Sequence, residues 1–183
     1  MAKKKKDGIL PFVLGVIAIL ILGWWIFPHI IFSEQEQPVH FNHDQHMNLE
    51  EQELKCRDCH FFRNDGTFNG RPDNELCAGS GCHDEMQTET AAESKLVNQY
   101  LEKNRTIPWK SYQKQPDNVY FSHIYHKKFD CSSCHLDLGY SEKLPSYHEN
   151  RITGYSKQTM KMHECERCHA QEGASNACFI CHK

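Results

Sequence analysis

The chain has little aliphatic material beyond its first 32 residues, and this shortage excludes an ordinary hydrophobic core. Mean hydropathy is −0.70 over 183 residues, although an apolar N-terminal stretch is included. That length allows one domain or two small ones. A folded head normally buries apolar side chains to offset the entropy lost on folding. Something other than side chains therefore fills the interior, and the 10 Cys and 13 His point to what it is.

Residues 9–32 lack charged side chains, and the segment that follows lacks a cleavage signal. The run ILPFVLGVIAILILGWWIFPHIIF is long enough to cross a bilayer core of ~30 Å. A secretory signal has an apolar region of ~7–15 residues and ends in small residues. Here FSEQEQPVHF follows, with no A-x-A pattern. We therefore predict an uncleaved transmembrane anchor.

The flanks of this run predict its orientation. Lys3, Lys4, Lys5 and Lys6 precede it, which favours a cytoplasmic N-terminus. Trp24 and Trp25 lie towards the other end, where interfacial aromatic residues belong. We expect a single-pass protein of the cell inner membrane, with a cytoplasmic basic tail and anchor in residues 1–32 and everything after them in the periplasm.

All ten cysteines fall into five close pairs, and a histidine follows each pair directly. In chain order these motifs are Cys56, Cys59, His60; Cys77, Cys82, His83; Cys131, Cys134, His135; Cys165, Cys168, His169; and Cys178, Cys181, His182. Disulfides and zinc sites also use paired cysteines, but neither requires a histidine after every second one. By chance five such histidines would occur at roughly two in a million, so the motifs predict five covalently attached haem c groups.

A weak internal repeat divides the part after the anchor into two halves. V-H-F-N-H-D-Q-H at 39–46 matches V-Y-F-S-H-I-Y-H at 119–126, and each copy precedes haem motifs. Between them, 91–104 carries apolar residues at helical spacing. We predict a dihaem segment at 33–90, a helical linker at 91–118 whose helix ends before Pro108 and packs one haem cluster against the other, and a trihaem segment at 119–183. The predicted fold class is mostly α and irregular: a transmembrane helix plus a multihaem cytochrome c head with a haem-filled core and little sheet.

The second axial ligand of each haem decides what the protein can do. Iron bound by two histidines has no open position and only passes electrons, whereas an open position allows chemistry at the metal. Eight histidines are left for this role: His29, His40, His43, His46, His123, His126, His148 and His163. We predict ligation by the four in the repeated units and by His163. Met160 and Met162 are alternative axial ligands.

Residues 119–183 resemble the trihaem class III cytochromes c. The shared order is V-x-F-x-H-x-x-H, C-x-x-C-H, H-x-C-x-x-C-H and C-x-x-C-H. The resemblance implies that the haems of His135, His169 and His182 are faced by His123, His126 and His163 respectively. By the repeat, His43 faces the haem of His60, and His46 that of His83. The four-residue spacer from Cys77 to Cys82 is also seen in tetrahaem members of the family.

An anchor joined to a head of this type resembles the multihaem cytochrome subunits of two related membrane assemblies. These are the quinone reductase complex (Qrc) of sulfate reducers and alternative complex III. The resemblance implies an integral-membrane quinone-binding subunit and iron–sulfur and molybdopterin-enzyme-like subunits as partners. We favour the first assembly because of the tetrahaem-type spacer. This implies a non-catalytic subunit that passes electrons from a soluble periplasmic tetrahaem cytochrome c towards menaquinone. In alternative complex III, by contrast, electrons run from quinol to cytochrome c.

One departure from the Qrc pattern concerns the number of haems. That cytochrome is usually described as hexahaem, and this chain has five full motifs. A sixth haem would bind non-covalently, with His148 or His40 as its ligand.

Two other classes of function stay open. One is a quinol dehydrogenase of the NapC/NrfH kind or a haem reductase, although no Cys-x-x-Cys-Lys motif marks a catalytic haem. The other is a haem-based sensor.

The part of the chain after the anchor is acidic. Four of the 21 basic and one of the 24 acidic residues precede residue 33, which leaves 17 basic and 23 acidic residues in the head. This acidic head favours a basic redox partner, and we expect no nucleic acid partner.

Overall fold

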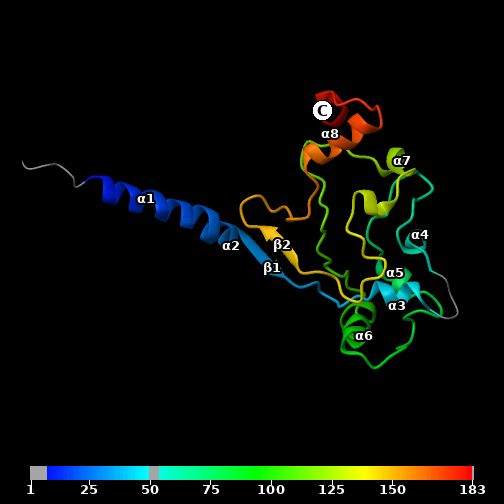
Figure 1. Ribbon diagram of the computed structural model, residues 1–183. Helices are drawn as coiled ribbons and strands as arrows, with labels where there is room; N and C mark the ends of the chain where they lie inside the picture. Colours follow the sequence, from blue (N-terminus) through cyan, green and yellow to red (C-terminus); the bar gives the residue numbers. More distant parts are fainter. Residues whose placement is uncertain (1–7, 50–53, 183) are drawn as a thin grey trace, which may run out of the picture.

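A long helix extends away from a head of short helices and loops (Figure 1). The computed structural model describes residues 8–49 and 54–182. The basic tail that carries the predicted orientation signal, at Lys3–Lys6, lies outside the described residues.

The long helix runs from Ile9 to Ile31 and is long and apolar enough to cross a membrane. It consists of α1 (Ile9–Ile21), a wider π turn η1 (Leu22–Ile26) and α2 (Phe27–Ile31). The proline in α2, Pro28, has no N–H, and its ring crowds the carbonyl of the preceding turn. This explains why a π turn comes directly before it.

A two-stranded sheet joins the end of this helix to a distant part of the chain. Strand β1 (Phe32–Gln35) pairs antiparallel with β2 (Tyr147–Asn150), in a register that sets Phe32 opposite Asn150. The backbone N–H of Arg151 also donates to the carbonyl of Ile31, at 2.8 Å. In the part of the chain that the structure describes, this is the one sheet, in keeping with the small strand content expected.

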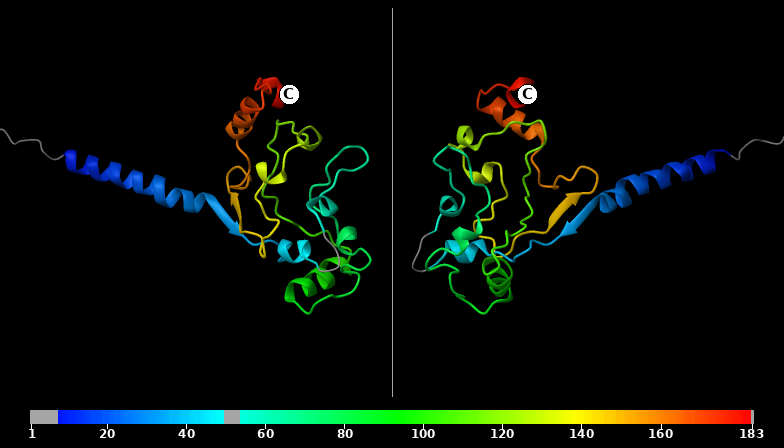
Figure 2. Two further views of the ribbon diagram at one scale, coloured as in Figure 1. Left: turned by 45° about the vertical axis from the view of Figure 1, so that its right-hand side comes forward. Right: turned by 180° about the vertical axis from the view of Figure 1, so that it is seen from behind.

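Short helical turns carry the cysteine motifs and the repeated histidine units. The histidine units form α3 (His43–Met47) and α7 (His123–His126). The cysteine motifs lie on α4 (Cys56–Cys59), α5 (Asn74–Cys77), the 3-10 turn η3 (Cys131–Ser133), α8 (Met162–Gln171) and α9 (Cys178–Cys181). Long loops connect them (Figure 2).

The apolar core of the head is very small, as the hydropathy predicts. Val39, Leu96 and Ile107 are buried together, and Tyr100, Leu101 and Trp109 pack against them. Leu96 belongs to the helix predicted at 91–104. That helix is present as α6 (Ala91–Lys95) and a π-helical continuation η2 (Leu96–Leu101). It ends earlier than expected because Asn104 adopts a left-handed conformation, with φ at 47°.

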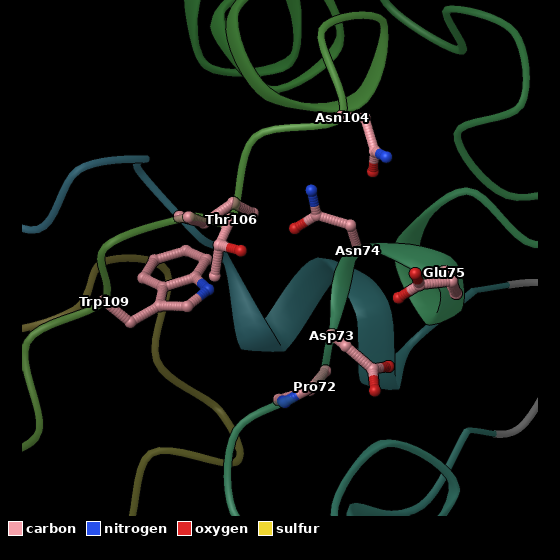
Figure 3. Close-up of a pocket in the computed structure, with 8 residues that line it drawn as sticks. Pro72, Asp73, Asn74, Glu75, Asn104, Thr106 and Trp109 are labelled. Carbon is pink, nitrogen blue, oxygen red and sulfur yellow. The ribbon is translucent and has the colours of Figure 1, made fainter.

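The segment after η2 lies against α5 and its preceding loop. Asn74 Nδ2 donates to the backbone carbonyl of Arg105 at 2.8 Å, and the guanidinium of Arg71 donates to the backbone carbonyl of Trp109. The two stretches line a small pocket (Figure 3). The linker is therefore fastened to the first half of the head.

Candidate haem sites

The ten cysteines are all free thiols in the structure, so none is committed to a disulfide. Among the described residues, no three His, Cys, Asp or Glu side chains converge as a structural zinc site requires. Burial, followed by the charge of nearby groups, raises the pKa of Cys59 and Cys134. The nearby thiols include Cys82 for Cys59 and Cys168 for Cys134. The first motif thus lies near the second, and the third lies near the fourth.

In the first repeated unit, one phenylalanine contacts both histidines. The ring of Phe41 meets that of His43 edge-on, with centres 4.7 Å apart, and stacks on that of His46 at 4.4 Å. Asn42 caps the short helix α3 by accepting a hydrogen bond from the N–H of Gln45. The unit thereby fixes the directions of two imidazoles.

The second unit repeats this geometry. Phe121 meets His123 edge-on at 4.8 Å and lies 4.6 Å from His126, at an interplanar angle of 30°. A further ring, Phe68 of the first half, stacks on His123 at 4.5 Å. The sequence repeat is therefore also a structural repeat of two oriented imidazoles.

Three of the five predicted histidine pairs face each other at one common distance. Ring centres are 6.1 Å apart for His46 with His83, for His123 with His135 and for His126 with His169. The last two pairs are close to parallel, at 9° and 15°. Imidazoles on opposite sides of one metal, with each nitrogen about 2.0–2.1 Å from it, place their ring centres roughly 6 Å apart. These three pairs therefore fit the two axial positions of a haem iron.

The other two predicted pairs differ from one another. His43 and His60 are near enough for their charges to interact. Burial, then the charges of His60 and His46, lowers the pKa of His43 to about 4. His43 is thus neutral at pH 7, as a metal ligand must be. Within the described chain, by contrast, no ring contact joins His163 of α8 to His182.

Two predicted ligands of the second half, His123 and His135, also have a lowered pKa. Burial, then the charges of His135 and His126, lowers the pKa of His123. Burial, then the charge of His60, lowers the pKa of His135. Neutral imidazoles have a nitrogen lone pair free for a metal. The interaction of His60 with His135 also shows that a motif of the first half lies beside one of the second.

Five of the predicted ligands donate Nδ1–H to a backbone carbonyl, which leaves Nε2 free for a metal. The acceptors are Asn42 for His46 (2.7 Å), Gly70 for His60 (2.5 Å), Ser122 for His126 (3.0 Å), Ser175 for His169 (3.2 Å) and Asn118 for His182 (3.0 Å). Such partners set the tautomer and the ring orientation of metal-binding histidines.

His83 departs from this rule, because its Nδ1 lies 2.8 Å from the carboxylate of Glu93. Glu93 is one of the few buried charged or polar residues, with 5% of its surface exposed. Burial would raise the pKa of this carboxyl. Hydrogen bonds from Thr88, Gln87 and His83 outweigh that and lower the pKa to about 2. The group is therefore an anion at neutral pH.

The remaining candidates lie elsewhere. His148 is in β2, where Nδ1 donates to the carbonyl of Ser146 and Nε2 is 3.9 Å from Glu34. His40 and His29 are exposed. The sulfur of Met160 accepts from the Cys165 thiol at 3.4 Å, and Met162 is largely exposed. None of these five forms one of the histidine pairs described above.

Sequence reasoning missed four residues at these sites: Phe41, Phe121, Phe68 and Glu93. The two repeated phenylalanines carried a signal, because they recur at the same place in both units. Thr90-Ala-Ala-Glu93 matches a helix capping box, which would assign Glu93 to the helix end. Nothing in the sequence marks Phe68, since its contact with His123 spans 55 positions.

Comparison with known proteins gives two findings. The model of the class III cytochrome c family matches residues 28–108, which include the first histidine unit and the first two motifs. The clearest resemblance in the sequence lay in the other half, at 119–183, and the repeat explains why both halves carry it. The chain is also 42% identical to the menaquinone reductase multihaem cytochrome c subunit of Nitratidesulfovibrio vulgaris, over 96% of this chain and 90% of that one.

A likeness that covers nearly all of both chains shows that they belong to one family, and the class III match identifies that family as one of haem c proteins. It implies covalently bound haem c, and the paired imidazoles described above fit that group. By its sequence, its paired histidines and these two matches, the chain belongs to the multihaem class III cytochromes c, in one family with the menaquinone reductase cytochrome subunit.

Proposed function

We propose that this chain is the non-catalytic electron-transfer subunit of a membrane-bound menaquinone reductase. It holds five covalent haems and passes electrons from a soluble periplasmic tetrahaem cytochrome c to partners that reduce menaquinone. The name of the 42%-identical relative supports the complex, and the class III family match supports the cofactor.

The observation that carries the proposal is the pairing of imidazoles at 6.1 Å. Two histidines on opposite sides fill both axial positions of an iron, so no position is open to a substrate. Bound in such a site, haem supplies one-electron chemistry without bond making. The chain's own residues orient the ligands, and burial lowers the pKa of His43, His123 and His135, which favours their neutral form. This favours electron transfer over a haem reductase or a gas sensor.

The anchor and the surface charge support the rest of the proposal. The apolar helix Ile9–Ile31 exposes its side chains all round, as a lipid-facing helix does. With that helix in the inner membrane and its N-terminus in the cytoplasm, the head lies in the periplasm, where haem c is attached. The acidic head attracts a basic soluble partner and speeds the encounter.

The test uses the purified holoprotein, first alone and then in its complex. Intact mass should correspond to five haems, and iron analysis beyond that number would reveal a sixth, non-covalent one. The reduced chain should not bind carbon monoxide, and alone it should not oxidise a quinol analogue. The complex should carry electrons from reduced tetrahaem cytochrome to menaquinone. Carbon monoxide binding or unaided quinol oxidation would overturn the proposal in favour of a sensor or a quinol dehydrogenase.

A further inference from the structure

One of the predicted iron ligands has an unusual partner at its outer nitrogen. Six of the predicted ligands donate a hydrogen bond from Nδ1. In five of them the acceptor is a neutral backbone carbonyl. In His83 the acceptor is the carboxylate of Glu93, at 2.8 Å. Among the ion pairs of the described residues, His83 is also the one partner of Glu93. The negative charge is thus directed at this imidazole.

The carboxylate is held where it is by its own donors. Its oxygens accept from Gln87 N at 2.7 Å, and from Thr88 N and Thr88 Oγ1 at 2.5 Å each. Glu93 is only 5% exposed, so water does not compete for it. The carboxylate is therefore held against His83 by groups of the protein itself.

This carboxylate does not cap the helix that it belongs to. The cap of α6 is Thr90, whose Oγ1 accepts from the N–H of Glu93 at 3.2 Å. In a capping box the glutamate would return to the N-cap N–H. Instead the side chain of Glu93 binds the preceding loop and His83. Helix capping thus does not explain its buried position.

A carboxylate bound to the outer N–H of a ligating histidine makes the ligand more basic and fixes its plane. A more basic ligand stabilises the more oxidised iron, which lowers the reduction potential. We infer that Glu93 is a positioning residue that orients His83 and lowers the reduction potential of the haem at Cys77 and Cys82 below that of sites with carbonyl acceptors. This inference rests on the proposed function, since it needs a haem at that motif.

The test compares Glu93→Gln with Glu89→Gln in the full-length holoprotein. Both changes remove one negative charge from the same stretch, but Glu89 is exposed and has no hydrogen bond to His83. Redox titration should show one of the five potentials raised in Glu93→Gln and none moved in Glu89→Gln. We expect about a tenfold change in the equilibrium constant for reduction, which is about 59 mV for one electron. The electron paramagnetic resonance signal of one low-spin haem should shift with it.

A third variant separates tuning from a merely structural role. Thr88→Val removes a hydrogen bond from the carboxylate but keeps its charge, so the affected potential should fall or stay, never rise. A rise in Thr88→Val equal to that in Glu93→Gln would assign the network a structural role and overturn the inference. Unmoved potentials in Glu93→Gln, or loss of that haem, would also overturn it. A wild-type mass without haem would instead refute the proposed function.

Discussion

At the scale of single residues, the phenylalanine of each repeated unit explains how two histidines can serve two different sites. Phe41 and Phe121 each contact both histidines of their unit, edge-on for one and nearer to face-on for the other. Aromatic contacts of these kinds contribute about 0.5–1.5 kcal/mol each. A ring placed between two imidazoles therefore prevents both from turning, and keeps each directed at its own partner.

His126 provides a residue-scale prediction, because its ring faces that of His169 at 6.1 Å. In His126→Ala one axial position should become open, and the reduced holoprotein should bind carbon monoxide at one haem, measured by the Soret shift. His148→Ala is the control, since His148 lies in β2 and faces Glu34. Wild type and the control should bind none. Binding in His148→Ala would instead indicate that this histidine is an iron ligand.

The histidine pairs show how far the sequence can predict a site. The repeat and the family resemblance named the partners of His83, His135 and His169, and the structure brings each pair together. The pairing of His163 with His182 stays a prediction. His163 is fixed on α8, and the path of the loop from α8 to α9 decides where His182 points. That path depends on tertiary contacts that no local motif encodes.

At the scale of elements, local spacing predicted the helix after residue 91 but not its form. Apolar residues at helical intervals indicate a buried face, which Leu96 provides. They do not distinguish an α-helix from the π-helical turns of η2. Strands β1 and β2, FSEQ and YHEN, have no clear alternation of apolar and polar residues. Their pairing is a tertiary outcome, and the sequence therefore predicted little sheet without placing it.

The small apolar cluster supplies an element-scale prediction. Leu96 is buried against Val39 and Ile107 and holds the linker helix to the first half. Leu96→Ala should lower the free energy of unfolding of the holoprotein by about 2 kcal/mol, near the low end of such substitutions because the cluster is small. Denaturant titration followed by Soret circular dichroism measures it. Ile152→Ala, at a side chain that is 75% exposed, should change stability by less than about 0.5 kcal/mol. Equal effects would show that the cluster does not stabilise the head.

At the scale of the whole molecule, the two halves of the head touch directly. Phe68 stacks on His123 at 4.5 Å, Arg57 Nη2 donates to the carbonyl of Lys127 at 3.2 Å, and His43 N donates to that of Ser141 at 3.0 Å. The first motif therefore faces the second half, although the second motif is nearer to the second half in sequence. Sequence order could not reveal this, because the linker returns to pack on Val39.

The sheet gives the head a fixed attachment to the apolar helix. Strand β1 begins at the residue after α2 and pairs with β2 of the second half. Ser33 Oγ donates to the carbonyl of Glu149 at 3.4 Å, and Gln35 Nε2 to its carboxylate at 3.1 Å. A head joined in this way keeps a defined orientation relative to the apolar helix, which under the proposed function suits electron exchange with an integral-membrane partner better than a flexible tether would.

The anchor itself provides the whole-molecule prediction. If Ile9–Ile31 spans the inner membrane, full-length protein should stay with membranes after a carbonate wash. Val16→Arg places a charge at the middle of the run, at a cost of about 2.5–3.5 kcal/mol, and should reduce the membrane-bound fraction, whereas Ile152→Arg in the head should not. In spheroplasts, external protease should digest the head and spare an N-terminal epitope. A mature protein that has lost the N-terminal epitope but keeps an intact head would identify the helix as a cleaved signal. An uncleaved helix would leave the epitope and the head on one chain.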